Sequence, residues 1–427
     1  MAKHVIFLGA GASVTSGYPL AADLRKIFSS TYSFGNHLRE KIGQIDKPLT
    51  ISLAKWFSRL SSPIELFREG GFGTVDEFSF LAGKRFPQEV HEIKQLVGLV
   101  FALHNPEKSY KTADGQPTNG FESSDYYPLI QRLFRESDEI RDDIAILSYN
   151  YDPYFEFLLN RAYIRRKQAT IKNQIVIPPT EFTSGFMDRD AKAITERKGF
   201  CLLKLHGTSV LPPPPTKVAG FEDGFLTFDE VFWEQDKLLN SQNDWSVKTN
   251  PSPAMYFPWE LLDDKDNFVG QDRFADSESL AANFYFQHIG RTLYELCKAI
   301  WQRARREIAE ADKISFVGLS MHEFLKPGLR FLFKERLRKF EESPTKDLDW
   351  QLEIILACPG AWSSGETFRS LPRPNSPAAK LASILSEVNP GMAKKEKGQI
   401  YSRNSGKKSV GGVICYDSFK DFIEAEL

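Results

Sequence analysis

Short apolar runs alternate along the chain with longer stretches whose apolar residues follow helical spacing. Each run is rich in Val, Ile and Leu and bounded by Gly or polar residues, a pattern typical of strands buried on both faces of a parallel sheet. The clearest runs lie at residues 5–8, 144–147, 201–205, 314–317, 352–357 and 413–416. The sequence thus predicts a parallel sheet as the centre of the fold.

Helical spacing separates these runs. Helices are expected at about 20–28, 126–134 and 324–340, with a short one from Phe419 and another that Pro153 opens at its first turn. Residues 51–103 also show helical spacing, with one apolar face formed by Leu53, Trp56, Phe57 and Leu60. Strands separated by helices predict an α/β fold, a Rossmann-like parallel sheet with right-handed crossovers.

The 427 residues exceed what a single core usually serves. We expect a single α/β domain over residues 1–427 that contains large insertions. A helical insertion is predicted at 29–135, an irregular, aromatic-rich insertion or lid at 207–285, and a variable loop region at 359–411. The basic, Gly- and Ser-rich segment 394–408 favours a mobile surface loop.

Composition narrows the class of protein. Hydrophobic residues make up 41% of the chain and charged residues 26%, which is ordinary for a soluble globular protein. Lys and Arg number 55 against 56 Asp and Glu, so no global positive field indicates direct binding of nucleic acid. The chain begins without a signal-peptide pattern and has no long apolar run, which predicts a cytoplasmic protein without a membrane contact.

The four cysteines lie far apart and form no C-x-x-C pair. Neither a thiolate zinc site nor a disulfide framework is therefore predicted, and no metal is expected. The cysteines are interpreted as reduced, mostly buried thiols.

The first predicted strand ends in a glycine turn made by Gly9, Ala10, Gly11, Ala12 and Ser13. Glycines there let backbone N–H groups approach a pyrophosphate, and the serine hydroxyl adds a donor. Val14 stands where the third glycine of the dinucleotide fingerprint would be, which disfavours a hydride-transferring dehydrogenase. A tight strand-to-helix turn without a ligand is the alternative.

Three further polar elements follow predicted strands. Asn150 could hold ribose hydroxyls or a water and Asp152 could accept from a carboxamide, although both could simply cap the helix at Pro153. His206 could take a proton near neutral pH, or be a buried histidine bonded to the backbone. The turn with Gly318 and Ser320 suits the adenosine side of a dinucleotide, or is a plain turn. Because a parallel sheet binds ligands at the carboxyl ends of its strands, these elements should converge.

In order, the segments GAGAS-VTSGYP, SYNYD, KLHGT and VGLSMHEF resemble the motifs of the sirtuin-like fold. The resemblance is by motif and spans residues 5–324 in scattered islands. It implies that Gly9, Ala10, Gly11 and Ser13 lie against the phosphates of NAD. It further implies contacts from Asn150 to the nicotinamide ribose and from Asp152 to the nicotinamide amide, with His206 as the catalytic base.

The chain departs from deacetylating sirtuins in three ways. Tyr18-Pro19-Leu20 replaces an I-P-D-F-R stretch, no thiolate zinc module is present, and the interval from Asn150 to His206 is long. The resemblance is accordingly to the NAD-hydrolysing sirtuin-like effectors of bacterial anti-phage defence, which share these features. An NAD glycohydrolase that releases nicotinamide and ADP-ribose is the leading hypothesis, with NAD as substrate.

Two other functions stay open: a module that binds NAD or ADP-ribose without turnover, and an NAD-dependent protein deacylase. A hydrolase that was always active would deplete NAD, so an off state is expected. The helical region 51–134 and the aromatic segment 221–259 are candidate surfaces for a homo-oligomer or for a partner such as a DNA-translocating ATPase.

Overall fold

The computed structural model describes the elements below and the residues that surround them. The described residues are 3–16, 18–42, 64–66, 68, 75–85, 94, 97, 100–101, 124–152, 154–156, 158–159, 162, 182–184, 195, 200–207, 257, 260, 262–263, 265, 267–268, 284–319, 325–342, 353–357, 380–381, 383, 408–410, 413–416 and 419–427. The apolar face predicted around Trp56 lies outside these residues, as does most of the predicted insertion 207–285.

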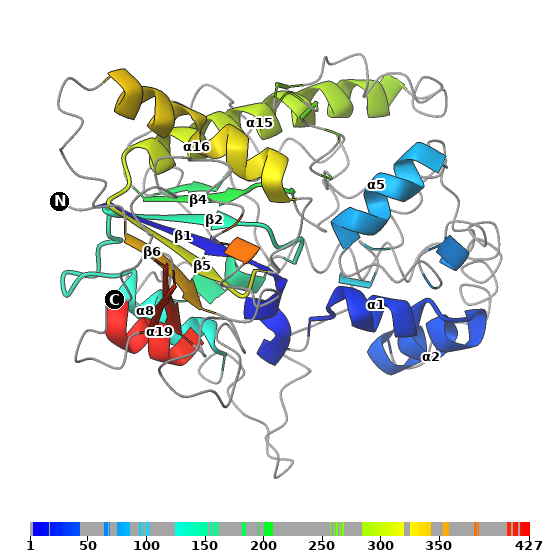
Figure 1. Ribbon diagram of the computed structural model, residues 1–427. Coiled ribbons are helices and arrows are strands. Elements are labelled where there is room, and N and C mark those ends of the chain that lie inside the picture. The colour runs from blue at the N-terminus through cyan, green and yellow to red at the C-terminus, as the bar shows by residue number, and fades with distance from the viewer. Residues whose placement is uncertain are drawn as a thin grey trace, which may run out of the picture.

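The centre of the structure is an eight-stranded sheet in the order β3-β4-β2-β1-β5-β6-β8-β7 (Figure 1). Its strands are β1 (His4–Leu8), β2 (Ile144–Ser148), β3 (Phe182–Ser184), β4 (Phe200–Lys204), β5 (Lys313–Val317), β6 (Glu353–Ala357), β7 (Lys408–Val410) and β8 (Val413–Tyr416). All neighbouring strands are parallel except β7 and β8. The predicted Rossmann-like parallel sheet is thereby confirmed.

The strand order has a functional consequence. Without the edge strands β3 and β7, the order β4-β2-β1-β5-β6-β8 places the chain's first three strands on one side and the next three on the other. The direction of winding therefore reverses between β1 and β5. In open α/β sheets a ligand binds in the crevice at this reversal, outside the carboxyl ends of the strands.

Both faces of the sheet are covered, which explains the uninterrupted apolar runs. Alternate residues of β1 point to opposite sides: Val5 and Phe7 join a core with Trp301, whereas Ile6 and Leu8 join a core with Tyr126. Trp301 belongs to α15 (Phe284–Ala309), which packs with α16 (Leu325–Glu342) on the first face. The second face is covered by α8 (Tyr126–Arg132) and α19 (Phe419–Glu426), as Figure 1 shows.

The other helices whose bounds are assigned in the described part of the chain precede α8. They are α1 (Ala21–Ile27), α2 (Thr31–Ile42) and α5 (Val75–Arg85), and a 3-10 helix, η1 (Ala10–Ser16), directly follows β1. Three described helices, α2, α5 and α8, fall within the predicted insertion 29–135. The division of the chain into one domain with insertions stays a prediction.

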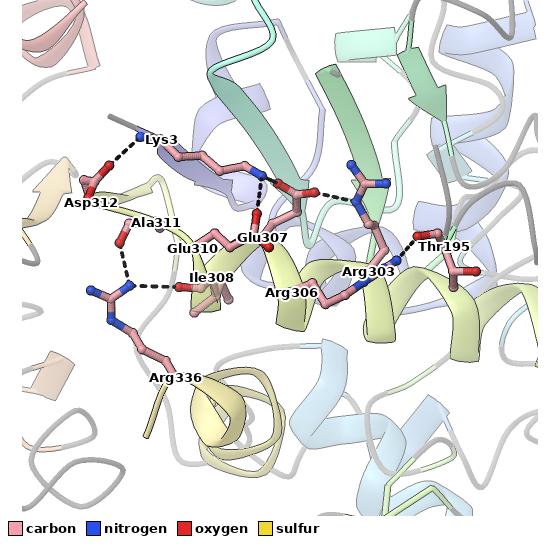
Figure 2. Close-up of polar contacts among 10 residues, drawn as sticks. All are labelled: Lys3, Thr195, Arg303, Arg306, Glu307, Ile308, Glu310, Ala311, Asp312 and Arg336. Carbon is pink, nitrogen blue, oxygen red and sulfur yellow. Dashed lines mark hydrogen bonds and ion pairs between the residues drawn. The ribbon is translucent and has the colours of Figure 1, made fainter. Parts of the chain in front are cut away.

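The amino-terminal edge of the sheet is closed by a cluster of ion pairs (Figure 2). Glu307 of α15 is almost fully buried and pairs with both Lys3, just before β1, and Arg303, one turn earlier on its own helix. The backbone N–H of Lys3 donates to Asp312 at 2.8 Å. This cluster fastens Lys3 to the end of α15, at the edge opposite the carboxyl ends of the strands.

Two expectations from composition have structural counterparts. Cys201 and Cys297 are buried free thiols, as predicted for the cysteines. Of the helices in the described part of the chain, none is both long enough and apolar enough to cross a membrane.

Candidate functional site

The sequence-predicted site residues follow the carboxyl ends of four adjacent strands. Leu8, the last residue of β1, is paired with Ser148 of β2 and with Val317 of β5, and Ser148 is paired in turn with Lys204 of β4. The residues that come next along each strand therefore leave the sheet at a common edge. This edge contains the winding reversal between β1 and β5.

The two glycine turns beside that reversal pack directly against each other. A Cβ atom on Gly9 would lie 2.5 Å from the Cα of Leu319, and one on Gly11 would lie 2.8 Å from the carbonyl oxygen of Gly318. Gly318 itself has a φ of 60°, in the left-handed region that favours glycine. All three glycines are thus required for close backbone contact between the turns after β1 and β5.

This packing also determines how three N–H donors of the first turn are used. The N–H of Gly9 donates to the carbonyl of Val317 and that of Gly11 to the carbonyl of Gly318, each at 2.8 Å, while the N–H of Ala12 donates to Gly9 at 2.9 Å. These donors were expected to bind a pyrophosphate, but they are consumed within the protein. Ala10 and Gly11 are nevertheless exposed, so the outer side of the turn is open to a ligand.

Ser13 also differs from its expected role. Its side chain is fully buried, and its hydroxyl lies 2.8 Å from the hydroxyl of Tyr126 and accepts from the Asn150 amide at 3.0 Å. The Asn150 amide nitrogen donates to the Tyr126 hydroxyl as well, at 3.1 Å. Ser13 therefore fixes the Asn150 side chain rather than facing a phosphate.

Tyr126 was not predicted as part of the site. It is the first residue of α8, and burial raises the pKa of its phenol well above the ordinary value. Because the group stays protonated, it can donate a hydrogen bond within the triangle it forms with Ser13 and Asn150. The sequence gives no signal of the contact between Tyr126 and Asn150, because the tyrosine is the first residue of a separate helix more than twenty residues before Asn150.

Asp152 performs the capping role that the sequence left open. Its carboxylate accepts from the backbone N–H of Tyr154 at 3.1 Å, at the start of the helical residues 154–156. Asn150 does not cap this helix, because its side chain points to Ser13 and Tyr126. Asn150 and Asp152 therefore have different main partners, although against the effect of burial a hydrogen bond with Ser13 also lowers the pKa of Asp152.

Lys204 and Glu156 complete the buried polar cluster and were also missed. The Lys204 ammonium donates to the backbone carbonyl of Asp152 at 2.5 Å and pairs with the Glu156 carboxylate at 3.1 Å. Burial raises the pKa of both carboxyl groups, Asp152 and Glu156, and the Lys204 charge opposes that rise. The sequence contained one signal of this cluster: Lys204 ends an otherwise apolar strand, and a buried cation needs an acidic or polar partner.

His206 lies in the turn after β4, enclosed by aromatic rings. Tyr149 meets the imidazole edge-on at 4.6 Å between ring centroids, and Tyr151 lies at 5.7 Å. The indole N–H of Trp301 donates to the carbonyl of Leu205 at 2.8 Å and so anchors the turn. Gly207, with a φ of 71°, allows the chain to turn away immediately afterwards.

Burial lowers the pKa of His206 to about 3, and the neighbouring Lys204 charge adds to the effect. The expected titration near neutral pH is therefore not found in this arrangement. The imidazole is neutral at pH 7, which is the form that accepts a proton, but it is a weak base while it remains buried. Stronger basicity would require water or a negative charge beside the ring.

Two remaining predictions concern the turn after β5 and metal binding. Gly318 packs against the backbone of Gly11 and Ala12 in the turn after β1. Ser320 lies outside the described residues. Within the described ranges, no group of three or more His, Cys, Asp or Glu side chains is arranged to hold a metal ion.

Comparison with known proteins leaves the family open: no protein-family model matches the chain, and no curated protein sequence matches it. The resemblance to the sirtuin-like fold therefore rests on the four sequence motifs alone.

Proposed function

We propose that the chain binds NAD at the carboxyl edge of the sheet and hydrolyses the bond between nicotinamide and ribose. The observation that supports this best is the position of Asn150. Its amide nitrogen is held by two hydroxyl groups, and its amide oxygen is buried with no hydrogen-bond partner among the described residues. A buried acceptor of this kind is costly unless a ligand or water satisfies it.

For this reaction the protein needs mainly to position the substrate, stabilise the developing charge and supply a base. Nicotinamide leaves as a neutral molecule from a positively charged ring, so the ribose passes through an oxocarbenium-like state that needs support and exclusion of bulk water. Asn150 would hold a ribose hydroxyl or the attacking water, and Asp152 would accept from the carboxamide. His206 would take the proton of water, directly or through a ribose hydroxyl.

The phosphates would lie across the exposed side of the turn at Ala10 and Gly11, at the winding reversal where such sheets bind ligands. The adenosine would lie toward Gly318 and β5. By the same motif resemblance, we propose that NAD depletion serves anti-phage defence. The cytoplasm is the compartment that such a role implies, and a homo-oligomer or a DNA-translocating ATPase is the kind of partner expected.

The test measures binding and turnover together. Calorimetric titration gives the affinity for NAD, and chromatography of the same samples measures released nicotinamide. Asn150→Asp keeps the size of the side chain but removes the amide nitrogen that donates to Ser13 and Tyr126. We expect release to fall at least about a hundredfold in this variant, with Glu424→Gln on the exposed face of α19 as an unaffected control. Equal release by both proteins contradicts the proposal.

A second function has an observation in its favour. A module that binds NAD or ADP-ribose without turnover needs no base, and the low pKa of about 3 makes His206 a weak one in this arrangement. Such a module would show NAD binding by calorimetry with no nicotinamide release under any condition. Release that depends on His206 would exclude it.

A further inference from the structure

The polar site is closed by three aromatic side chains, Phe101, Tyr151 and Phe257, which we call the aromatic cover. Tyr151 is central: its ring lies 6.4 Å from that of Phe101 and 6.2 Å from that of Phe257. The same ring lies 5.7 Å from the imidazole of His206. All three aromatic side chains are buried, and Phe257 is fully so.

The cover is assembled from segments that are far apart in the chain. Phe101 lies between α5 and α8, Tyr151 follows β2, and Phe257 lies between β4 and α15. Tyr151 comes from the loop after β2, whereas the other two residues come from stretches distant from any strand of the sheet. Their packing against Tyr151, which itself contacts His206, joins those stretches at the carboxyl edge of the sheet.

An ion pair holds Phe257 in this position. The ammonium of Lys94 donates to one carboxylate oxygen of Glu260 at 2.6 Å, and the other oxygen accepts from the backbone N–H of Phe257 at 2.8 Å. Lys94 also lies over the Phe257 ring, 5.5 Å from its centroid. Both side chains of the ion pair are nearly nine-tenths buried, so solvent screens the pair only weakly.

With the cover in place the site is inaccessible. Asn150 retains 3% and His206 1% of full exposure, whereas an attacking water and a ribose must both reach them. Opening requires Tyr151 to move, and the packing of Phe257 against it opposes that motion. The pair of Lys94 and Glu260 is the polar contact that ties Phe257 to the segment before α8.

We propose that the ion pair of Lys94 and Glu260 is a latch that keeps the aromatic cover closed, so that the chain as it stands is an inhibited form. The proposal concerns regulation of the site and rests on the proposed function for its effect on NAD. Breaking the latch exposes His206 and raises NAD cleavage. A partner or a second copy that competes for Lys94 or Glu260 would activate the protein in the same way.

The experiment measures exposure of His206 without reference to NAD. The full chain is treated with diethyl pyrocarbonate, and mass spectrometry follows modification of His206 and of His4 with time. His4 is buried at the opposite edge of the sheet, where its ring is hydrogen-bonded to Ser315 at 2.7 Å, and serves as the internal reference. The variants are Glu260→Gln and Lys94→Met, with Glu424→Gln of an exposed ion pair as the matched control.

We expect the ratio of His206 modification to His4 modification to rise about tenfold in both latch variants and to stay unchanged in the control. A tenfold change corresponds to about 1.4 kcal/mol. Nicotinamide release should rise by a similar factor. An unchanged ratio overturns the latch, including the case where general unfolding raises both histidines equally. A raised ratio with no nicotinamide release from any form supports the latch and contradicts the proposed hydrolase.

Discussion

Replacing Gly318 with alanine tests the contact between the two glycine turns, on which the geometry of the ligand edge depends. The added Cβ would lie 2.2 Å from the backbone nitrogen of Ala12 and 2.7 Å from the carbonyl carbon of Gly11. Both neighbours are main-chain atoms, so neither can rotate out of the way. The φ of 60° is also unfavourable for any residue with a Cβ atom.

The magnitude follows from these two effects. A left-handed backbone costs an L-residue about 1–2 kcal/mol, and forcing an extra carbon into a packed interior costs about 1–3 kcal/mol. We therefore expect Gly318→Ala to lower the free energy of unfolding by about 2–5 kcal/mol. That is a large part of the 5–15 kcal/mol typical of a folded protein.

The assay is urea denaturation followed by circular dichroism, with Gly35→Ala as the matched control. Gly35 lies inside α2, and a Cβ added there meets nothing within 4 Å. The same chemical change should stabilise the protein by about 0.5–1 kcal/mol at that position, because alanine favours a helix. Equal unfolding free energies for Gly318→Ala and the wild-type protein would refute the described packing of the turns.

Three further predictions concern the helix α15 and the turn it anchors. Glu307→Gln should lower the unfolding free energy by about 3 kcal/mol in urea denaturation, because Arg303 loses its buried counter-charge. The control Glu310→Gln, at an exposed ion pair, should change it by less than about 1 kcal/mol. Equal effects of the two substitutions would contradict the buried pair. Trp301→Phe removes the indole N–H that donates to the carbonyl of Leu205, the residue before His206. We expect the free energy of unfolding to fall by about 1–3 kcal/mol and nicotinamide release to slow at unchanged NAD affinity. Unchanged release would count against anchoring of the turn by Trp301. His206 binds a proton more weakly in the folded chain, where its pKa is about 3, than in the unfolded chain, where it is about 6.5. The folded state is therefore most stable with respect to this group above about pH 6.5, and this stability is lost as the pH falls toward 3. His206→Gln should therefore shrink the loss of stability between pH 7 and pH 5 by about 2 kcal/mol, and an identical loss in both proteins would contradict the burial.

Burial on both faces made the central strands predictable. The predicted runs agree with β1, β2, β4, β5, β6 and β8 to within one residue at each end, because most side chains of a strand buried on both faces are apolar. β3 and β7 are three-residue edge strands, FTS and KSV, whose composition shows no such run. The strand β7 falls within the predicted variable loop region 359–411, because its three residues give no apolar run that would mark a strand.

The helix α15 was not predicted, although the sequence contains its pattern. Its buried residues Cys297, Ile300, Trp301, Ala304 and Ile308 recur at spacings of one, three and four. That spacing is the periodicity of one helix face. Charged residues between them, including the buried Arg303 and Glu307, dilute the apolar signal.

Site residues were predictable only where a motif marks a strand end. Asn150 and His206 stand directly after predicted strands, and the register places them at one edge. Their contacts were not predictable, because Tyr126 and Glu156 come from other elements and are defined by tertiary packing. The glycines were identified as sites of close approach, and the structure shows that the turn after β5 approaches them; phosphate binding at the outer side of the first turn stays a prediction.

Hydrolysis of NAD at this edge of the sheet is measured by analysis of its two products. Purified protein is incubated with NAD, and nicotinamide and ADP-ribose are quantified by mass spectrometry for the wild-type chain, Glu260→Gln and the double variant Glu260→Gln with Asn150→Asp. We expect equal amounts of the two products, more of both from Glu260→Gln than from the wild-type chain, and neither from the double variant. NAD left intact by all three proteins would contradict the proposed hydrolysis.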